Sequence, residues 1–222
     1  MNLKHIALVL ILSTGIVVHA EEIKLVEKDA ATVLYRDSSE ANRIGKKFSA
    51  NWELFGSGPA GTSESGVSAA YHLNRNSLIQ LEYGKGGFSS FWSDLTSISF
   101  NGSHIGLHFK HFAGNSFYFK TGIDYRQIQY RYNYNSLTTD GAYDFEGNSI
   151  GASFVIGNQW QWDNFTLGCD WIGLTAPLTS EVTHEHVSVE GPYTRQDMYY
   201  AEDNRLKSTY VQALRFYVGY SF

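Results

Sequence analysis

Apolar and polar residues alternate with a period of two through most of the sequence from residue 48 to residue 222. This period is typical of β-strands with one apolar and one polar face, whereas a helix would repeat about every 3.6 residues. It predicts eight strands, in residues 48–55, 67–73, 78–83, 104–112, 117–125, 150–157, 165–174 and 210–222. We therefore expect an all-β fold.

The connections between the predicted strands alternate in length. Residues 74–77, 113–116 and 159–164 form short connections, and residues 56–66, 84–103, 126–149 and 173–209 form long ones. All three prolines, Pro59, Pro177 and Pro192, fall in the long connections, which agrees with the inability of proline to donate to a β-ladder. Because alternate connections of an antiparallel meander emerge at opposite ends, the pattern predicts tight turns at one end and long loops at the other.

The N-terminus has the pattern of a cleaved export signal. Lys4 and His5 precede an apolar stretch, residues 6–18, and Ala20 ends a motif of small residues. This stretch is too short to span about 30 Å of hydrocarbon, so residues 1–20 are predicted to be a signal peptide. Residues 21–47 are charged and lead into the first strand at the short-turn end. We expect them to form a periplasmic arm or a short helix, with a ninth strand or a partial plug as the alternative.

Composition excludes several classes of protein. The mean hydropathy is −0.26, and no apolar run after the N-terminus approaches the roughly 20 residues of a membrane helix, so a helical membrane bundle is excluded. The net charge of −5 argues against nucleic-acid binding, which selects basic surfaces. The only cysteine, Cys169, cannot form an intramolecular disulfide. Its place among apolar residues predicts that it packs as a small hydrophobe.

The polar face of the predicted strands is rich in ionisable and amide side chains. They are Glu53, His72, Gln80, Glu82, His104, His108, Lys110, Lys120, Asp124, Asp170 and Arg215. Parity alone does not say which face points outward. Three features favour an apolar face toward lipid: the 15% aromatic content, strands of about 9 to 11 residues that fit a tilted membrane strand, and the apolar last strand. The alternative is an exported water-soluble barrel with a ligand in its cavity.

The last strand ends on an aromatic residue that is preceded by apolar residues at intervals of two. These are Leu214, Phe216, Val218, Tyr220 and Phe222. The strand resembles the C-terminal assembly signal of bacterial outer-membrane proteins, and the strand count resembles the small OmpA-, OmpX- and OmpW-like barrels. The resemblance covers residues 48–222. It implies an eight-stranded antiparallel up-and-down transmembrane β-barrel with short periplasmic turns and long extracellular loops, inserted by the outer-membrane assembly machinery, with Phe222 as the recognised terminal residue.

An eight-stranded barrel has room only for its own side chains, so the charges of the polar face would have to pair with one another. The predicted lumen network consists of Glu53, Glu82, His104, His108, Lys110, Lys120, Asp124, Asp170 and Arg215. We expect it to be structural, with a gated ion path or proton relay as the alternative. The lumen histidines could bind metal, but we expect hydrogen-bonding fillers and no metal or cofactor.

The last long connection contains two motifs that could carry chemistry. His184 and His186 would project from one side of an extended segment, but two ligands do not make a metal site. His186 and Ser188 resemble the His-x-Ser pair of outer-membrane lipid A deacylases, in which the His activates the Ser hydroxyl. In those enzymes the pair lies on a barrel strand, whereas here it falls in a predicted loop. We therefore expect no catalytic residue.

The apolar positions change phase between residues 100 and 105 and again between residues 125 and 128. Each change predicts a bulge, at Gly102 and near Arg126. The two strands would then continue beyond the membrane as a hairpin rich in tyrosine, including Tyr130, Tyr132 and Tyr134. Such a hairpin suits surface interaction and cross-strand packing equally well.

Together these features predict a non-enzymatic protein of the bacterial outer membrane that serves envelope structure or surface interaction, with a lumen too narrow for a general pore. A narrow porin-like transporter of small or apolar solutes and a lipid A-modifying enzyme are the alternatives. The expected partners are outer-membrane lipid and lipopolysaccharide, the assembly machinery at the C-terminal strand, and a surface partner at the long loops. No nucleic acid is expected.

Overall fold

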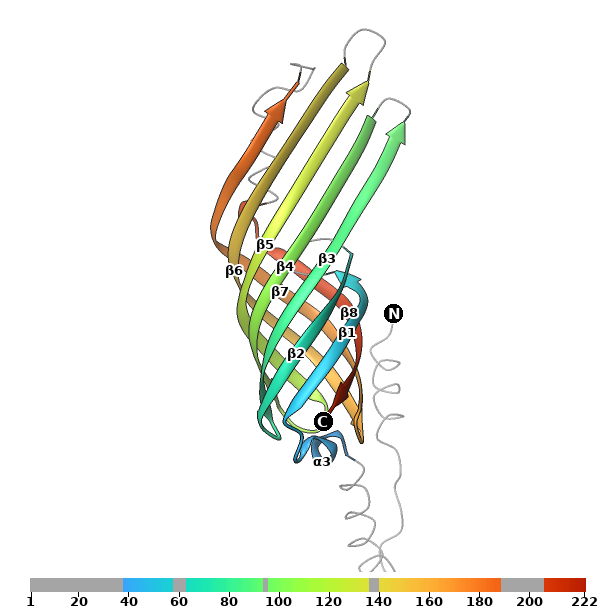
Figure 1. The fold of residues 1–222 in the computed structure, drawn as a ribbon, viewed down its shortest axis with the longest axis vertical. Coiled ribbons are helices and arrows are strands. Elements are labelled where there is room, and N and C mark those ends of the chain that lie inside the picture. The colour runs from blue at the N-terminus through green and yellow to red at the C-terminus, as the bar shows by residue number, and fades with distance from the viewer. Residues whose placement is uncertain (1–37, 58–62, 94–95, 136–139, 189–205) are drawn as a thin grey trace, which may run out of the picture. The chain divides into compact units, whose positions relative to one another are not determined.

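A computed structural model describes residues 38–57, 63–93, 96–135, 140–188 and 206–222. The predicted signal peptide and residues 21–37 of the predicted arm lie outside this part. The described residues form eight strands: β1 (Phe48–Ser57), β2 (Glu64–Asn74), β3 (Ser77–Ser93), β4 (Thr96–Phe112), β5 (Phe117–Asn135), β6 (Asp140–Trp162), β7 (Phe165–Val187) and β8 (Tyr210–Ser221). Each strand pairs antiparallel with the next, and β8 pairs with β1 to close the barrel (Figure 1). The expected eight-stranded up-and-down barrel is confirmed.

We call the closed ring, in which all eight strands pair, the lower barrel. Its apolar face points outward and its charged face points inward. Trp52 and Leu107 are 63% and 58% exposed, whereas Glu82 and Asp124 are fully buried. Water-soluble monomers rarely expose apolar patches of more than a few hundred Å², so this belt belongs in hydrocarbon and the barrel spans a membrane. The alternative of a water-soluble barrel with an apolar cavity is therefore wrong. No described helix is long and apolar enough to cross a bilayer.

Strands β3 to β7 are much longer than the sequence pattern predicted. β6 and β7 each have 23 residues, about twice the length that crosses a membrane. Much of what the sequence analysis treated as long loops, within residues 84–103, 126–149 and 173–209, is therefore paired strand. Above the closed ring, β3 to β7 continue as one sheet (Figure 1), which we call the protruding sheet.

The bulges predicted at Gly102 and near Arg126 are wrong. The β4–β5 pairing runs from Thr96 opposite Tyr134 to Phe112 opposite Tyr118, with no register shift along the described pairs. The side chains keep their alternation, and the chemistry of the two faces is exchanged instead. Toward the tips apolar side chains point inward and polar ones outward, because the outer wall passes from lipid into water.

A short helix closes the end of the barrel where the tight turns lie, which we call the turn end. α3 (Ser39–Arg43) begins after Ser38, whose hydroxyl accepts a hydrogen bond from the Ala41 amide as an N-cap. Arg43 donates to the backbone carbonyls of Arg75, Gly114 and Asn115 at 2.8 to 3.2 Å. These carbonyls belong to the β2–β3 and β4–β5 turns, so one side chain ties the helix to two turns.

The guanidinium of Arg43 also lies 3.8 Å above the ring of Phe112, and Arg43 is 1% exposed. Burial lowers the pKa of Arg43 to about 10, so the side chain remains a cation at neutral pH. Ser39 and Asn42 make hydrogen bonds of 3.0 Å to the backbone of Gln161 in β6. The helix is thus held by polar contacts to three sides of the turn end.

Candidate functional site

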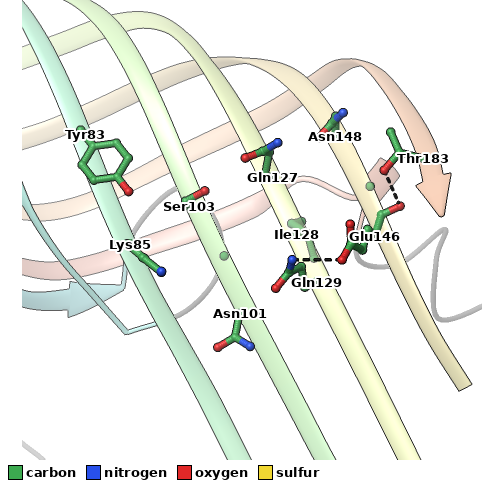
Figure 2. Close-up of a pocket in the computed structure, with 12 residues that line it drawn as sticks. Tyr83, Lys85, Asn101, Ser103, Gln127, Ile128, Gln129, Glu146, Asn148 and Thr183 are labelled. Carbon is green, nitrogen blue, oxygen red and sulfur yellow. Dashed lines mark hydrogen bonds between the residues drawn. The ribbon is translucent and has the colours of Figure 1, made fainter. Parts of the chain in front are cut away.

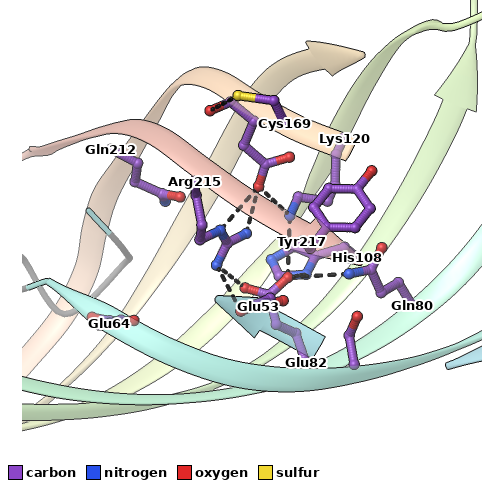
Figure 3. Close-up of polar contacts among 12 residues, drawn as sticks. Glu53, Glu64, Gln80, Glu82, His108, Lys120, Cys169, Gln212, Arg215 and Tyr217 are labelled. Atoms are coloured by element: carbon purple, nitrogen blue, oxygen red, sulfur yellow. Dashed lines mark hydrogen bonds and ion pairs between the residues drawn. The ribbon is translucent and has the colours of Figure 1, made fainter. Parts of the chain in front are cut away.

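The centre of the barrel interior is organised around Arg215 of β8. Its guanidinium pairs with three carboxylates that come from different strands: Asp170 at 2.6 Å, Glu53 at 3.4 Å, and Glu82 through a short contact. Figure 3 shows the guanidinium pointing toward Glu53 and Glu82. Arg215 is 2% exposed. A buried guanidinium with charged acceptors on several sides is a rigid cross-link between opposite walls of the barrel.

A second cation shares two of these carboxylates. The ammonium of Lys120 lies 3.1 Å from Glu82 and 3.1 Å from Asp170. Glu82 and Asp170 therefore each bridge Lys120 and Arg215, and Figure 3 shows Glu82, Lys120 and Arg215 close together inside the barrel. The arrangement neutralises the buried charges in a connected network rather than in isolated pairs, as burial in a low dielectric requires.

Two histidines extend the network toward the loop end, the end of the barrel opposite the turns. His104 lies between Glu64 and Glu82, with ring nitrogens 2.7 and 3.0 Å from their carboxylates. His108 lies 3.1 Å from Asp124 and 3.8 Å from Glu82. Each imidazole thus connects the central layer to an outer carboxylate.

Lys110 occupies a separate layer near the turn end. Its ammonium donates to Gln159 at 3.0 Å and to the hydroxyl of Tyr217 at 2.9 Å. It also lies 4.0 Å above the ring of Tyr118, so the cation is held by neutral acceptors and an aromatic face. The Tyr118 hydroxyl donates to Asp170 through a short hydrogen bond, which joins this layer to the central one.

Lumen glycines provide the room that these large side chains need. A Cβ on Gly168 would lie 2.0 Å from the Tyr217 ring, and one on Gly106 would lie 2.3 Å from the His108 ring. Both distances are far below contact, so no side chain fits at either position without displacing the network. The lumen is so tightly filled that these two positions can hold only glycine.

An apolar cluster covers the charged layers at the loop end. Phe100, Ile128, Tyr143 and Phe145 on the inner face of the protruding sheet pack with Leu206, which precedes β8. The backbone carbonyl of Leu206 lies 3.5 Å from the guanidinium of Arg126, at the top of the lumen. With α3 at the turn end, both ends of the interior are covered. Each of the nine residues of the predicted lumen network is at most 2% exposed.

All nine predicted lumen residues lie inside the barrel, and all belong to the network just described or to the Lys110 layer that is joined to it, counting Asp124 as a member through His108. The sequence analysis missed Glu64, Arg126, Tyr118 and Tyr217. Tyr118 and Tyr217 have inward parity, which was available as a signal, whereas Glu64 and Arg126 lay in segments that had been assigned to loops.

The His184–His186 motif lies on a strand rather than in a loop, whereas Ser188 of the His186–Ser188 motif directly follows that strand. β7 runs through His184 and His186 to Val187, and both histidines are exposed. The Ser188 hydroxyl accepts a hydrogen bond from the backbone amide of Ala142 at 3.0 Å. Among the described residues, no group of three or more His, Cys, Asp or Glu side chains is placed to hold a metal ion.

The tyrosine-rich hairpin packs inward in its described part. The ring of Tyr130 lies 5.4 Å from that of Phe145 and 6.3 Å from that of Tyr143. Of the two roles that the sequence left open for this segment, cross-strand packing is therefore the one that Tyr130 fulfils. The side chain of Tyr134 lies outside the described part.

The predicted C-terminal signal lies on the last barrel strand, at the seam between β8 and β1. Phe222 exchanges backbone hydrogen bonds of 2.9 Å with Phe48, and their rings lie 6.1 Å apart. Tyr220 is exposed, and the ring of Phe216 lies 5.1 Å from that of Phe55. Val218 pairs with Trp52. The apolar side chains of this strand thus line the outer wall at the position where the barrel closes.

Cys169 is buried in β7 beside the network, and its thiol contacts the backbone oxygen of Asp170 at 3.6 Å. A register irregularity follows it, where Gly157 pairs with Asp170 and Ile156 pairs with Ile172. Trp171 is the extra residue of this bulge and is exposed like Phe165, and beyond it the outward positions change from odd to even numbers, with Ile172 and Leu174 exposed.

Comparison with known proteins relates the chain to other barrels by fold. No protein-family model matches it, and no curated protein sequence is significantly similar to it. A major outer-membrane protein from Thermus thermophilus superimposes with a TM-score of 0.53 at 17% identity, covering 80% of this chain and 100% of that one. CarO2 from Acinetobacter baumannii gives a TM-score of 0.53 at 12% identity, with 80% and 99% covered. The chain therefore has the fold of the small eight-stranded outer-membrane β-barrels.

Proposed function

We propose that the protein is a non-enzymatic bacterial outer-membrane barrel that conducts no solute and holds a structured sheet at the cell surface, where it serves envelope structure or surface interaction. In this orientation the turn end and α3 face the periplasm, and the protruding sheet lies on the extracellular side. The fold supports the location, because the solved structures of similar fold are outer-membrane proteins.

The filled interior carries the proposal. A solute path along the axis would have to displace Arg215 and Lys120 from Glu82 and Asp170, all of them buried. Separating one partner from a buried ion pair costs about 3–5 kcal/mol, and here the pairs share partners. The apolar cluster and α3 would also have to move. The architecture therefore favours a rigid, sealed barrel over a channel.

Planar-bilayer recording with the purified, refolded full-length protein tests this proposal. We expect no resolved single-channel conductance at either polarity, with a wide-lumen porin recorded in parallel to show that insertion and detection work. A reproducible, well-resolved conductance from the wild-type protein would overturn the proposal and support the porin-like transporter instead. Heat-dependent electrophoretic mobility of the same sample shows that the barrel is folded.

We further propose that the C-terminal strand is the segment recognised by the outer-membrane assembly machinery, through Phe216, Val218, Tyr220 and Phe222. Their side chains line the outer wall at the seam that closes last in sequence order. Removing Phe222 should lower the amount of folded protein in the outer-membrane fraction by about tenfold, a loss of roughly 1.4 kcal/mol of recognition. The matched control is Phe48→Ala, which removes the facing ring of the same stack; equal losses in both variants would contradict the proposal.

A further inference from the structure

The outer surface of the protruding sheet has a polar hollow just above the lipid-facing belt. It has a volume of about 580 Å³, and Lys85, Asn101, Ser103, Gln127, Gln129 and Asn148 are among the side chains that line it. Figure 2 shows these side chains arranged along neighbouring strands of one sheet, with Glu146 and Thr183 at one side. The strands are β3 to β7, so the hollow spans the whole width of the sheet.

The strand register places this hollow next to the lipid-facing belt. One row across four strands consists of Tyr83, Ile105, Tyr125 and Ile150, which pair in that order and are all exposed apolar or aromatic residues. The next outward row toward the tips consists of Lys85, Ser103, Gln127 and Asn148, which also pair in that order. Rows two residues apart are separated by about 7 Å along a strand. The hollow thus extends from Tyr83, in the last lipid-facing row, across the polar row above it, where lipid headgroups would lie.

A second, smaller hollow continues the first one away from the membrane. It has a volume of about 100 Å³, shares Asn101, Gln129 and Glu146 with the larger hollow, and adds Ser99, Arg131 and Asp144. Asn101, Gln129 and Glu146 form the third row of the register, and Ser99, Arg131 and Asp144 form the fourth. We call the two hollows together the outer groove. It rises over three rows from the membrane boundary, in the direction that a headgroup extends.

The chemistry of the outer groove suits the hydroxyl groups of a polyhydroxylated ligand. Amide and hydroxyl groups dominate its lining, and these groups both donate and accept hydrogen bonds. The charged side chains among the described residues that line the two hollows are balanced, with Lys85 and Arg131 as cations and Glu146 and Asp144 as anions. Glu146 already accepts a hydrogen bond of 3.0 Å from Gln129. A phosphate site would instead gather several cations, so the array matches sugar hydroxyls better.

We propose that the outer groove binds the sugar headgroup of a glycolipid in the outer leaflet, the class to which lipopolysaccharide belongs. The acyl chains would lie against the row formed by Tyr83, Ile105, Tyr125 and Ile150, and the sugars would occupy the rows above it. This inference rests on the proposed function for one element, the placement of the protruding sheet on the extracellular side.

The test measures binding of purified lipopolysaccharide to the full-length protein in phospholipid nanodiscs. The groove variant is the double substitution Gln127→Ala and Asn148→Ala, which removes two amides from the first polar row. The control variant is Ser89→Ala and Asn133→Ala, which changes two residues on the outward parity of the same sheet that line neither hollow and lie outside the apolar row. All three proteins are first shown to be folded by their heat-dependent electrophoretic mobility.

We expect the groove variant to bind lipopolysaccharide at least about fivefold more weakly than the wild type, because each neutral hydrogen bond contributes a factor of roughly two to ten. The control variant should stay within about twofold. Equal binding by the wild type and the groove variant would overturn the inference. So would equally tight binding of the delipidated oligosaccharide, which would identify a soluble saccharide as the ligand, or an equal response to anionic phospholipid alone.

The outcome is separable from that of the conductance experiment. If the wild-type protein conducts ions but the groove variant loses lipopolysaccharide, the sealed-barrel proposal fails and the glycolipid inference stands. If the protein is silent in bilayers and the groove variant binds normally, the reverse holds.

Discussion

The lower barrel and the protruding sheet are built from the same strands with opposite polarity. In the lower barrel, Leu107 and Ile123 face outward while Glu82 and Asp124 are buried; in the protruding sheet, Gln127 and Gln129 face outward while Ile128 is buried. β4 and β5 pass through both regions without a register shift between them. The comparison shows that the surrounding medium, rather than a change in backbone geometry, determines which residue types occupy each face.

The two regions also differ in what fills the interior. The lower barrel is filled by buried ion pairs, each of which needs its partner to remain stable. The protruding sheet is instead stabilised by a buried apolar cluster. A charged network loses much of its stability when one member is removed, because its former partners remain buried. An apolar cluster loses stability in proportion to the volume removed. Substitutions should therefore have different consequences in the two regions.

The largest effect should come from removing the central cation of the lower barrel. Arg215→Leu leaves Asp170, Glu53 and Glu82 with one strong partner fewer, and we expect the free energy of unfolding to fall by about 3–5 kcal/mol. Urea titration in lipid vesicles, followed by tryptophan fluorescence, measures it. Arg131→Ala, which removes an exposed cation from the protruding sheet, should change the value by less than about 0.5 kcal/mol.

If Arg215→Leu does not fold at all, Arg215→Lys provides the second measurement. It keeps the charge but loses the planar fork that contacts several carboxylates, so its loss should lie between those of Arg215→Leu and the wild type. Equal stability of Arg215→Leu and Arg131→Ala would show that the lumen ion pairs contribute nothing beyond surface charges.

A second prediction places the same new charge on the outer wall of both regions. Leu107→Arg puts a cation on the lipid face near the middle of the lower barrel, and it should destabilise the protein by about 2–4 kcal/mol. Gln129→Arg puts one on the outer wall of the protruding sheet, where we expect a change of less than about 0.5 kcal/mol. The same urea titration compares them. Similar costs at both positions would mean that the membrane boundary does not lie between Tyr125 and Gln127.

The smallest predicted effect comes from removing a single methylene from each region. Ile128→Val in the apolar cluster should cost about 0.5–1.5 kcal/mol, because the vacated space stays empty. Ile123→Val on the same strand faces lipid, and acyl chains fill the space, so its cost should be less than half as large. Hydrogen exchange of the β5 amides reports the two effects separately. A larger loss of stability in Ile123→Val than in Ile128→Val would contradict the assignment of Ile123 to the lipid face and of Ile128 to the packed interior.

The sequence predicted that all nine residues assigned to the lumen network share one face, because strand parity does not depend on the partners, and the aromatic content, strand lengths and last strand predicted that this face points inward. The sequence-based prediction failed where the strands leave the lipid and enter water, because the polarity of each face is then reversed. The phase changes around Gly102 and Arg126 were interpreted as bulges, since apolar residues were assumed to stay on one face. For the same reason Glu64 and Arg126 were assigned to loops, although they lie in paired strands beside His104 and Ser149.

The sequence by itself determined the number of strands, their order and the parity of their side chains, since these depend on a local period of two and on the lengths of connections. Only the tertiary structure decided which carboxylate pairs with which cation, how Leu206 and α3 cover the interior, and that the outer groove exists. These features join residues that are far apart in the chain, and their geometry depends on barrel closure and on the packing of side chains in a shared space.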